Sequence, residues 1–116
     1  MGRGSRAERA DLDAVGDAVD AVVGVLKKKY ARPRPHPKDR GFSYPSGAAA
    51  MAEVEARLLA RLEPLRAAAF LARAAQIGHD RMVLGVHHPT DIAAGIMLGD
   101  QLEPLFRESP ELRQLR

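Results

Sequence analysis

Cysteine and tryptophan are absent from this sequence, and aromatic residues make up only 4% of it. Without cysteine the chain cannot form a disulfide, a thiolate metal site, an iron–sulfur cluster or a cysteine nucleophile. The scarcity of aromatic rings leaves Leu, Val, Ile, Met and Ala to build the core. It also leaves few platforms on which the bases of a single-stranded nucleic acid could stack.

Long hydrophobic runs are missing as well. Charged residues interrupt every stretch before it reaches the roughly 18 apolar residues of a transmembrane helix, so no membrane span is expected. Residues 1–10 are polar and charged with no apolar stretch behind them, and this does not resemble a secretory signal. We expect a soluble protein, and these observations leave its compartment open.

The remaining composition is that of one globular domain. The 116 residues are 46% hydrophobic and 28% charged, which is an ordinary balance. Basic residues exceed acidic ones by 18 to 15, and a net charge of +3 is too small to indicate a nucleic-acid partner. A nucleic-acid binder is therefore the weakest interpretation, and steeply salt-dependent binding to duplex DNA would be needed to favour it.

Apolar residues recur at spacings of three and four along four stretches, and no stretch alternates for long as a strand would. The pattern predicts an all-α bundle of about four main helices. We expect a flexible basic arm over residues 1–9, a helical core over 10–108 and a tail over 109–116. The core helices are predicted over about 10–29, from the N-cap Ser46 to Leu62, from Leu65 to Leu84, and from Pro89 onward.

The long connection over residues 31–45 contains four prolines and cannot be a regular helix. It follows Lys27 and carries Arg34 between two of these prolines. One interpretation is a basic helix end followed by a solvated loop. The other is an anion clamp, because Lys supplies a point charge and Arg a planar fork that fits phosphate oxygens.

Ser46 and Gly47 open the second predicted helix. In the structural interpretation they are a helix cap followed by a small residue. In the functional interpretation they seat a phosphate, because a helix N-terminus offers free N–H groups and the positive end of the helix dipole.

The segment that leads into the fourth helix contains Arg81, His87 and Asp91. A lone His near a helix start is commonly structural, but Asp91 follows His87 by four residues and can reach one imidazole nitrogen. Such a pair fixes the tautomer and makes the other nitrogen more nucleophilic. A metal site is the weaker interpretation, since the adjacent His87 and His88 side chains diverge and no fourth ligand is evident.

Together the clusters form a spaced pattern: Lys27 and Arg34-Pro separated by six residues, Pro-Ser-Gly at 45–47, and Arg81 to Asp91 as Arg-x5-His-x3-Asp. This pattern resembles the three-part signature of the type 2 phosphatidic acid phosphatase superfamily. That superfamily includes the bacterial class A non-specific acid phosphatases, to which the likeness is closest, and the vanadium haloperoxidases. The resemblance covers about residues 20–100.

The resemblance implies a phosphoryl-transfer site at one end of a helical bundle. Carried over to the matching positions, His87 attacks phosphorus to form a phosphohistidine, and Asp91 orients His87. The phosphate oxygens are bound by Lys27, Arg34, Ser46, the Gly47 N–H and Arg81. No metal or other cofactor is implied, and vanadate fits the pocket as a phosphate mimic.

Two positions depart from the family pattern. Ala48 stands where the family has the His that protonates the leaving oxygen and then activates water. Ala cannot transfer a proton, and loss of such help costs roughly 10²- to 10⁴-fold in rate. None of the other histidines, His36, His79 and His88, is placed at that spot by the sequence. Asp80 replaces the usual Ser before Arg81, and we expect it to face solvent.

Two functions remain open from the sequence. One is a phosphomonoester hydrolase for small substrates, weakened by Ala48 and best with aryl phosphates, whose departure needs no proton. The other is an inactive relative that binds phosphate or vanadate. The family relatives carry further helices and some are exported, so a periplasmic or exported location and a homodimer that covers the apolar stripes are further expectations.

Overall fold

The computed structural model describes residues 6–108 and is built from helices, with no strand among these residues. This confirms the predicted all-α bundle. The elements in chain order are α1 (Arg6–Tyr30), α2 (Gly47–Leu62), a 3-10 turn η2 (Pro64–Arg66), α3 (Ala67–Val83) and α4 (Pro89–Glu108).

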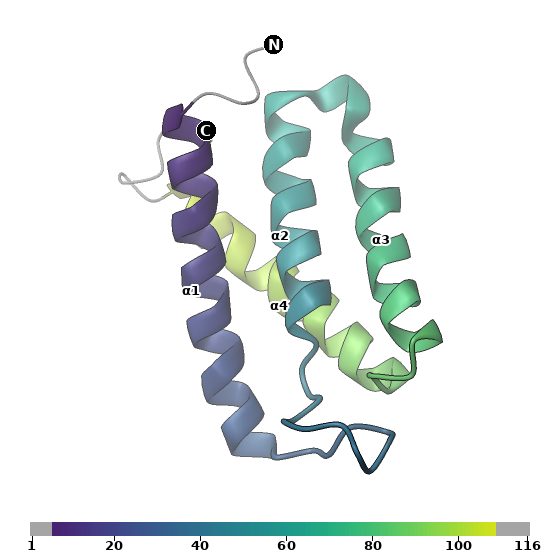
Figure 1. Ribbon diagram of the computed structural model, residues 1–116. Helices are drawn as coiled ribbons and strands as arrows, with labels where there is room; N and C mark the ends of the chain where they lie inside the picture. The colour runs from purple at the N-terminus through teal and green to yellow at the C-terminus, as the bar shows by residue number, and fades with distance from the viewer. Residues whose placement is uncertain (1–5, 109–116) are drawn as a thin grey trace.

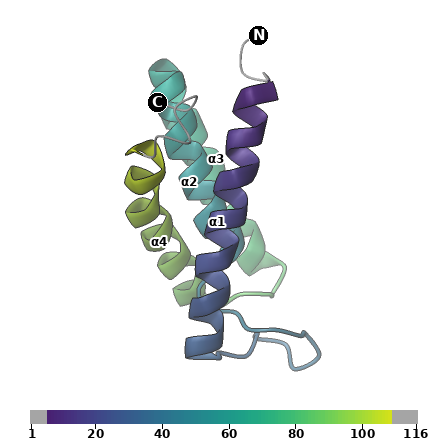
Figure 2. The same cartoon turned by 90° about the vertical axis from the view of Figure 1, so that its left-hand side faces the viewer.

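Helix α2 is the centre of the bundle. It lies between α1 and α3, and α4 crosses behind it (Figure 1). The view from the side shows the loop between α1 and α2 at one end of the molecule, near the start of α4 (Figure 2). The residues expected to carry chemistry are therefore gathered at this end, and the helices behind them form the support.

The core follows the helical period of the sequence. Apolar residues of α1 at spacings of four meet apolar residues of α2 with the same spacing, and all are buried. They are Val15, Val19, Val23, Ala50, Val54 and Leu58. Burial of each Val or Leu side chain contributes about 1.5–3 kcal/mol, and this burial holds α1 and α2 together.

Two glycines let α4 approach α2 closely. A Cβ atom at Gly95 would lie 2.5 Å from the Ser46 carbonyl oxygen, and one at Gly99 would lie 2.8 Å from Cβ of Glu53. Neither distance is compatible with a real side chain. These glycines therefore set the separation between the N-terminal half of α2 and α4.

The helix boundaries differ from the prediction in two places. Helix α1 begins at Arg6, so part of the segment 1–9 expected as a loose arm is helical. Residues 1–5 and the expected tail 109–116 lie outside the described residues. The third helix was predicted from Leu65, but Pro64 opens a 3-10 turn and α3 begins only at Ala67.

Candidate active site

The loop after α1 is closed on itself before it reaches α2. Ala31 has a positive φ of 49° and turns the chain out of the helix. The Ser43 N–H then donates to the Arg32 carbonyl at 2.8 Å, and Lys27 Nζ donates to the Phe42 carbonyl at 2.8 Å. These bonds hold the second half of the loop against the end of α1. The prolines exclude a helix here, but they do not by themselves bring the loop back to α1.

Ser46 joins the first turns of two helices. Its hydroxyl accepts a hydrogen bond from the Ala49 N–H at 3.1 Å, which confirms the predicted N-cap of α2. Its own N–H donates to the Asp91 carbonyl of α4 at 3.0 Å. This bond joins the start of α2 to the first turn of α4.

His87 is buried between α4 and the loop. Gly85, with φ of 77°, turns the chain after α3, and His87 follows two residues later with 4% of its surface exposed. Its Nδ1 lies 3.4 Å from Oδ2 of Asp91. Its Nε2 lies 3.4 Å from Nη1 of Arg34, which also donates to the Val86 carbonyl at 2.9 Å. One ring nitrogen thus faces a carboxylate and the other a cation.

The environment favours a neutral imidazole beside an ionised carboxylate. Burial lowers the pKa of His87, and the cations Arg34 and Lys27 lower it further against the opposing effect of Asp91. Burial alone would raise the pKa of Asp91. Hydrogen bonds from the His88 N–H, Ser43 and His87, together with the charge of Arg32, hold that pKa below its usual value.

Lys27 lies within the electrostatic influence of the other two predicted phosphate-binding cations, Arg34 and Arg81. The pKa of Lys27 is lowered by burial first, and then by the charges of Arg34 and Arg81. Arg81 lies at the end of α3, and its buried Nε has no hydrogen-bond partner among the described residues. A cluster of like charges around an unpaired donor is the arrangement that an oxyanion would relieve.

The remaining predicted positions lie on the first turn of α2. Gly47 is its first residue, and a Cβ there would lie 3.4 Å from a methyl of Val23. Ala48 follows, partly buried.

The other histidines and Asp80 lie outside this turn. His36 and His79 are exposed, and Asp80 faces solvent as expected, where it accepts a hydrogen bond from Gln76. His88 lies against the loop, with Nε2 3.2 Å from the Pro33 carbonyl.

Residues 17–102 match the model of the PAP2 superfamily. The chain belongs to the PAP2 superfamily. It is similar to a non-specific acid phosphatase of Providencia stuartii, with 26% identity over 114 residues that cover 86% of this chain and 46% of that protein. The chain thus spans about half the length of this curated relative. The family resemblance predicted from the three motifs is confirmed.

Arg32 belongs to the basic cluster interpreted from the sequence as an anion clamp, but the spacing assigned it no specific role in the site of this PAP2 chain. Arg32 reaches across the loop, and its Nη1 donates to Oδ1 of Asp91 at 2.8 Å and to Oγ1 of Thr90 at 2.6 Å. The only signal in the sequence was a second arginine two positions before Arg34. Spacing could not show which of the two arginines would meet the carboxylate.

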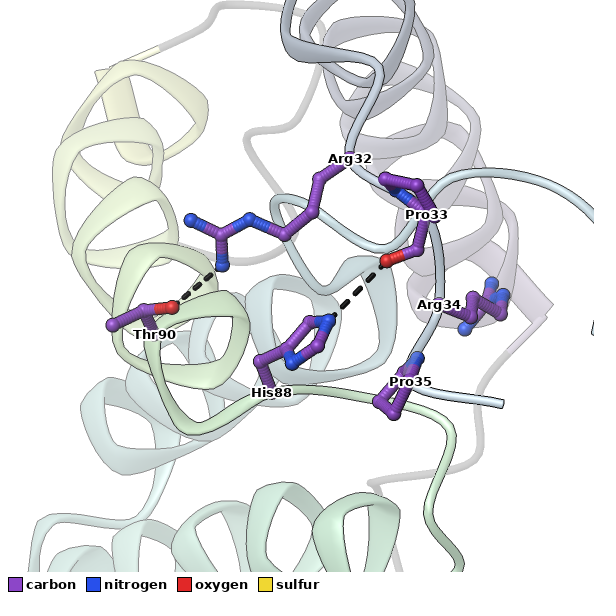
Figure 3. A pocket seen from close by; sticks show the side chains of 6 residues that line it. All are labelled: Arg32, Pro33, Arg34, Pro35, His88 and Thr90. Carbon is purple, nitrogen blue, oxygen red and sulfur yellow. Dashed lines mark hydrogen bonds between the residues drawn. The ribbon is translucent and has the colours of Figure 1, made fainter. Parts of the chain in front are cut away.

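A hollow of about 530 Å³ opens beside this contact. Figure 3 shows the side chains that line it: Arg32, Pro33, Arg34, Pro35, His88 and Thr90. In the same view His88 points toward the Pro33 carbonyl, while Arg32 reaches toward Thr90. The hollow shares Arg34 with the His87 site and is rimmed by cationic and imidazole groups.

Two further properties of residues 6–108 are relevant to the chemistry. No helix in this part of the chain is long and apolar enough to cross a membrane. Nor do three His, Asp or Glu side chains of the described segment come together in a way that could hold a metal ion.

Proposed function

We propose that this PAP2 protein hydrolyses small phosphomonoesters through a phosphohistidine formed on His87. The observation that supports this most is the placement of the buried His87 ring between Asp91 and Arg34. A neutral imidazole with a carboxylate behind one nitrogen has a lone pair on the other, which is what attack on phosphorus requires. The family assignment supports the same reaction class.

The first step forms one bond and breaks another. Nε2 of His87 bonds to phosphorus, and the bond between phosphorus and the ester oxygen breaks, so that the oxygen leaves with the bonding electrons. The positive charge that develops on the ring is stabilised by the Asp91 carboxylate at Nδ1. Water then attacks phosphorus, and the bond between phosphorus and Nε2 breaks with its electrons returning to the ring. Inorganic phosphate, which takes up the oxygen of the water, leaves and His87 is restored.

The cations hold the phosphoryl oxygens during both steps. In this proposal Arg81 offers its unpaired Nε, Arg34 turns from the imidazole to the phosphate, and Lys27 uses the donors that Phe42 leaves free. The N–H groups of the first turn of α2, beginning with Gly47, add the positive end of the helix dipole. Positive charge fixed around the phosphoryl group lowers the energy of the transition state.

Ala48 gives the proposed activity its particular selectivity. With a methyl group at this position, α2 supplies no proton to the leaving oxygen and no base to the attacking water. Aryl phosphates, whose oxygen leaves without a proton, are therefore expected to react faster than alkyl phosphates. Slow attack by water also predicts that the phosphohistidine accumulates.

The test is hydrolysis of p-nitrophenyl phosphate from pH 4 to 8 by the natural chain, His87→Ala and Ala48→His. We expect slow turnover by the natural chain, none by His87→Ala, and a gain of roughly 10²-fold or more in Ala48→His. Turnover that persists in His87→Ala would contradict the mechanism. The same variants are assayed with an alkyl phosphate. Equal gains in rate on the aryl and the alkyl substrate in Ala48→His would contradict the leaving-group selectivity.

Ala48 also favours a second candidate, an oxyanion-binding protein without turnover. The same cations would bind phosphate or vanadate, but the reaction would stop before hydrolysis. Vanadate binding, measured by calorimetry, with no phosphate release even at high protein concentration would support this function. Activity in Ala48→His alone would then show that the pocket is intact and that the missing acid is the reason.

A further inference from the structure

Arg32 connects the loop to the residue behind His87. Asp91 is fully buried and uses its two carboxylate oxygens differently. Oδ2 faces His87 Nδ1 at 3.4 Å and accepts the His88 N–H at 2.8 Å, whereas Oδ1 accepts from Arg32 at 2.8 Å. The guanidinium therefore binds the carboxylate on the side away from the imidazole.

The guanidinium is itself fixed from several directions. The same Nη1 also donates to the Thr90 hydroxyl at 2.6 Å, and the guanidinium carbon lies 4.7 Å from the centre of the Tyr44 ring. Tyr44 in turn meets Tyr30 edge to face, with ring centres 5.0 Å apart. A side chain held by a cation–π contact and two hydrogen bonds has little freedom to leave its carboxylate.

We propose that Arg32 is a positioning residue, which holds the outer oxygen of Asp91 and thereby fixes the orientation of the carboxylate toward His87. This inference rests on the proposed role of His87 as the nucleophile. Rotation of the carboxylate would move Oδ2 from Nδ1, and the ring could then adopt the tautomer that protonates Nε2 and removes its lone pair. Arg32 prevents that rotation.

Arg32 also limits how much negative charge Asp91 presents to the ring. The charged groups that act on His87 are Asp91, Arg34 and Lys27. Without Arg32, the Asp91 charge would be less compensated and would stabilise the imidazolium more strongly. A protonated His87 cannot attack phosphorus, so Arg32 would extend the pH range over which the nucleophile is available.

The test measures the His87 ring directly and needs no turnover. Nitrogen–proton correlation spectra of the full chain are titrated with pH, and the His87 signals are identified among the four histidines by their loss in His87→Gln. Rotation of Asp91 would weaken a hydrogen bond that raises the pKa of His87, but at 3.4 Å this bond is already long. In Arg32→Gln we therefore expect the loss of the Arg32 charge to dominate and the His87 titration midpoint to rise by roughly one pH unit. We also expect the neutral ring to change from mainly Nδ1–H to a mixture of tautomers.

Two variants serve as controls. Arg32→Lys keeps a cation and should bring the midpoint back toward that of the natural chain. Arg73→Gln removes an exposed arginine of α3 and should leave both the midpoint and the tautomer unchanged. A folded Arg32→Gln with the midpoint and tautomer of the natural chain would overturn the proposal.

If Arg32→Gln fails to fold, a double variant tests the proposal instead. Removing one partner leaves a buried charge uncompensated, but removing both charges relieves that cost. The double variant Arg32→Gln with Asp91→Asn should then fold again, whereas a double variant as unfolded as the single one would overturn the proposal. If the His87 signals move as expected and no phosphate is released by any variant, the proposed hydrolysis fails but the positioning role stands.

Discussion

Two buried carboxylates, Asp91 and Glu53, lie at the contact between α2 and α4, and their surroundings shift their pKa values in opposite directions. Asp91 is fully buried and its pKa is lowered, because backbone, hydroxyl and imidazole donors and Arg32 outweigh burial. Glu53 is 7% exposed and its pKa is raised, first by burial and then by its neighbour Asp100, against the effect of Arg57. Burial raises the pKa of both acids, and only at Asp91 do the hydrogen-bond donors and the neighbouring cation outweigh it.

The difference separates a reactive end of the bundle from a supporting one. At Asp91, the donors come from the loop, from Ser43 and from the turn before α4. At Glu53, one guanidinium serves two acids, since Arg57 Nε lies 2.7 Å from Glu53 and 2.6 Å from Asp100. The first arrangement favours an ionised Asp91 beside the His87 imidazole, and the second links α2 to α4 through Arg57.

The strongest way to test this comparison is to convert each acid to its amide. Asp91→Asn removes the charge that we propose orients and stabilises His87, and should slow formation of the proposed phosphohistidine by roughly 10³- to 10⁴-fold. Glu53→Gln should leave that rate within about twofold. Both rates are measured in single-turnover experiments with p-nitrophenyl phosphate, and a large loss in Glu53→Gln would remove the distinction between the two ends.

The two close glycines of α4 test the same distinction through packing. In Gly95→Ala the new methyl displaces the Ser46 carbonyl, and in Gly99→Ala it displaces Glu53 and the Ala50 carbonyl. Each variant should therefore lower the free energy of unfolding by about 1–3 kcal/mol. Gly95→Ala should also slow phosphoryl transfer, by roughly 10- to 100-fold, because it displaces the N-cap Ser46. Gly99→Ala should slow it less, because it meets α2 only from Ala50 onward. Urea unfolding and the single-turnover assay measure the two effects.

A matched control for these glycines exists on α1. A Cβ at Gly24 would meet no atom within 4 Å. Gly24→Ala should therefore stabilise the protein by about 0.5–1 kcal/mol through the helix propensity of Ala. A similar rise in the free energy of unfolding in Gly95→Ala would mean that α4 can move away from α2 without loss of stability. The close packing of the two helices would then not be required for the fold.

The opposite pKa directions predict opposite pH dependence of stability. The lowered pKa of Asp91 contributes stability above the unfolded-state pKa of Asp, which is lost as the pH falls through the folded-state pKa. The raised pKa of Glu53 contributes stability below the unfolded-state pKa of Glu, which is lost as the pH rises through the folded-state pKa. From pH 3 to 7, the cost of Asp91→Asn in urea unfolding should grow and that of Glu53→Gln should shrink.

The smallest expected effect on stability concerns Ala31, the turn residue directly before Arg32. Ala31 has a φ of 49°, a conformation that costs an L-residue roughly 1 kcal/mol. Ala31→Gly should therefore raise the free energy of unfolding slightly, by at most about 1 kcal/mol. Ala75→Gly, at an exposed position within α3, should lower it by about 0.5–1 kcal/mol, and equal losses in both variants would contradict the strained turn.

Much of this molecule follows from local signals in the sequence. Apolar spacing predicts the helices, and Ser46 marks the start of α2 because its hydroxyl can cap the first turn. The four-residue step from His87 to Asp91 across a helix start predicts their contact, because the carboxylate can reach back to an imidazole nitrogen. Each of these features depends on neighbours within a few positions of the chain.

The remainder depends on contacts between distant segments. The sequence contains Arg32 and Arg34 in similar surroundings, and only the closed loop decides that Arg32 meets Asp91 while Arg34 meets His87. Glu53 is an ordinary acid on a helix until Gly99 brings α4 over it. The first turn of the third helix was misplaced because Pro64 stabilises a 3-10 turn that the apolar pattern does not reveal.

The hydrogen bonds of the reactive end also have a kinetic consequence. Arg32 and Asp91 are 59 residues apart in the chain and Arg34 and His87 are 53 apart, whereas α2 and α3 are joined by a short turn. Contacts that close long loops carry a larger entropic cost, and we expect them to form after the α2–α3 hairpin has folded. Changes at Arg32 should therefore accelerate unfolding while leaving the refolding rate nearly unaltered.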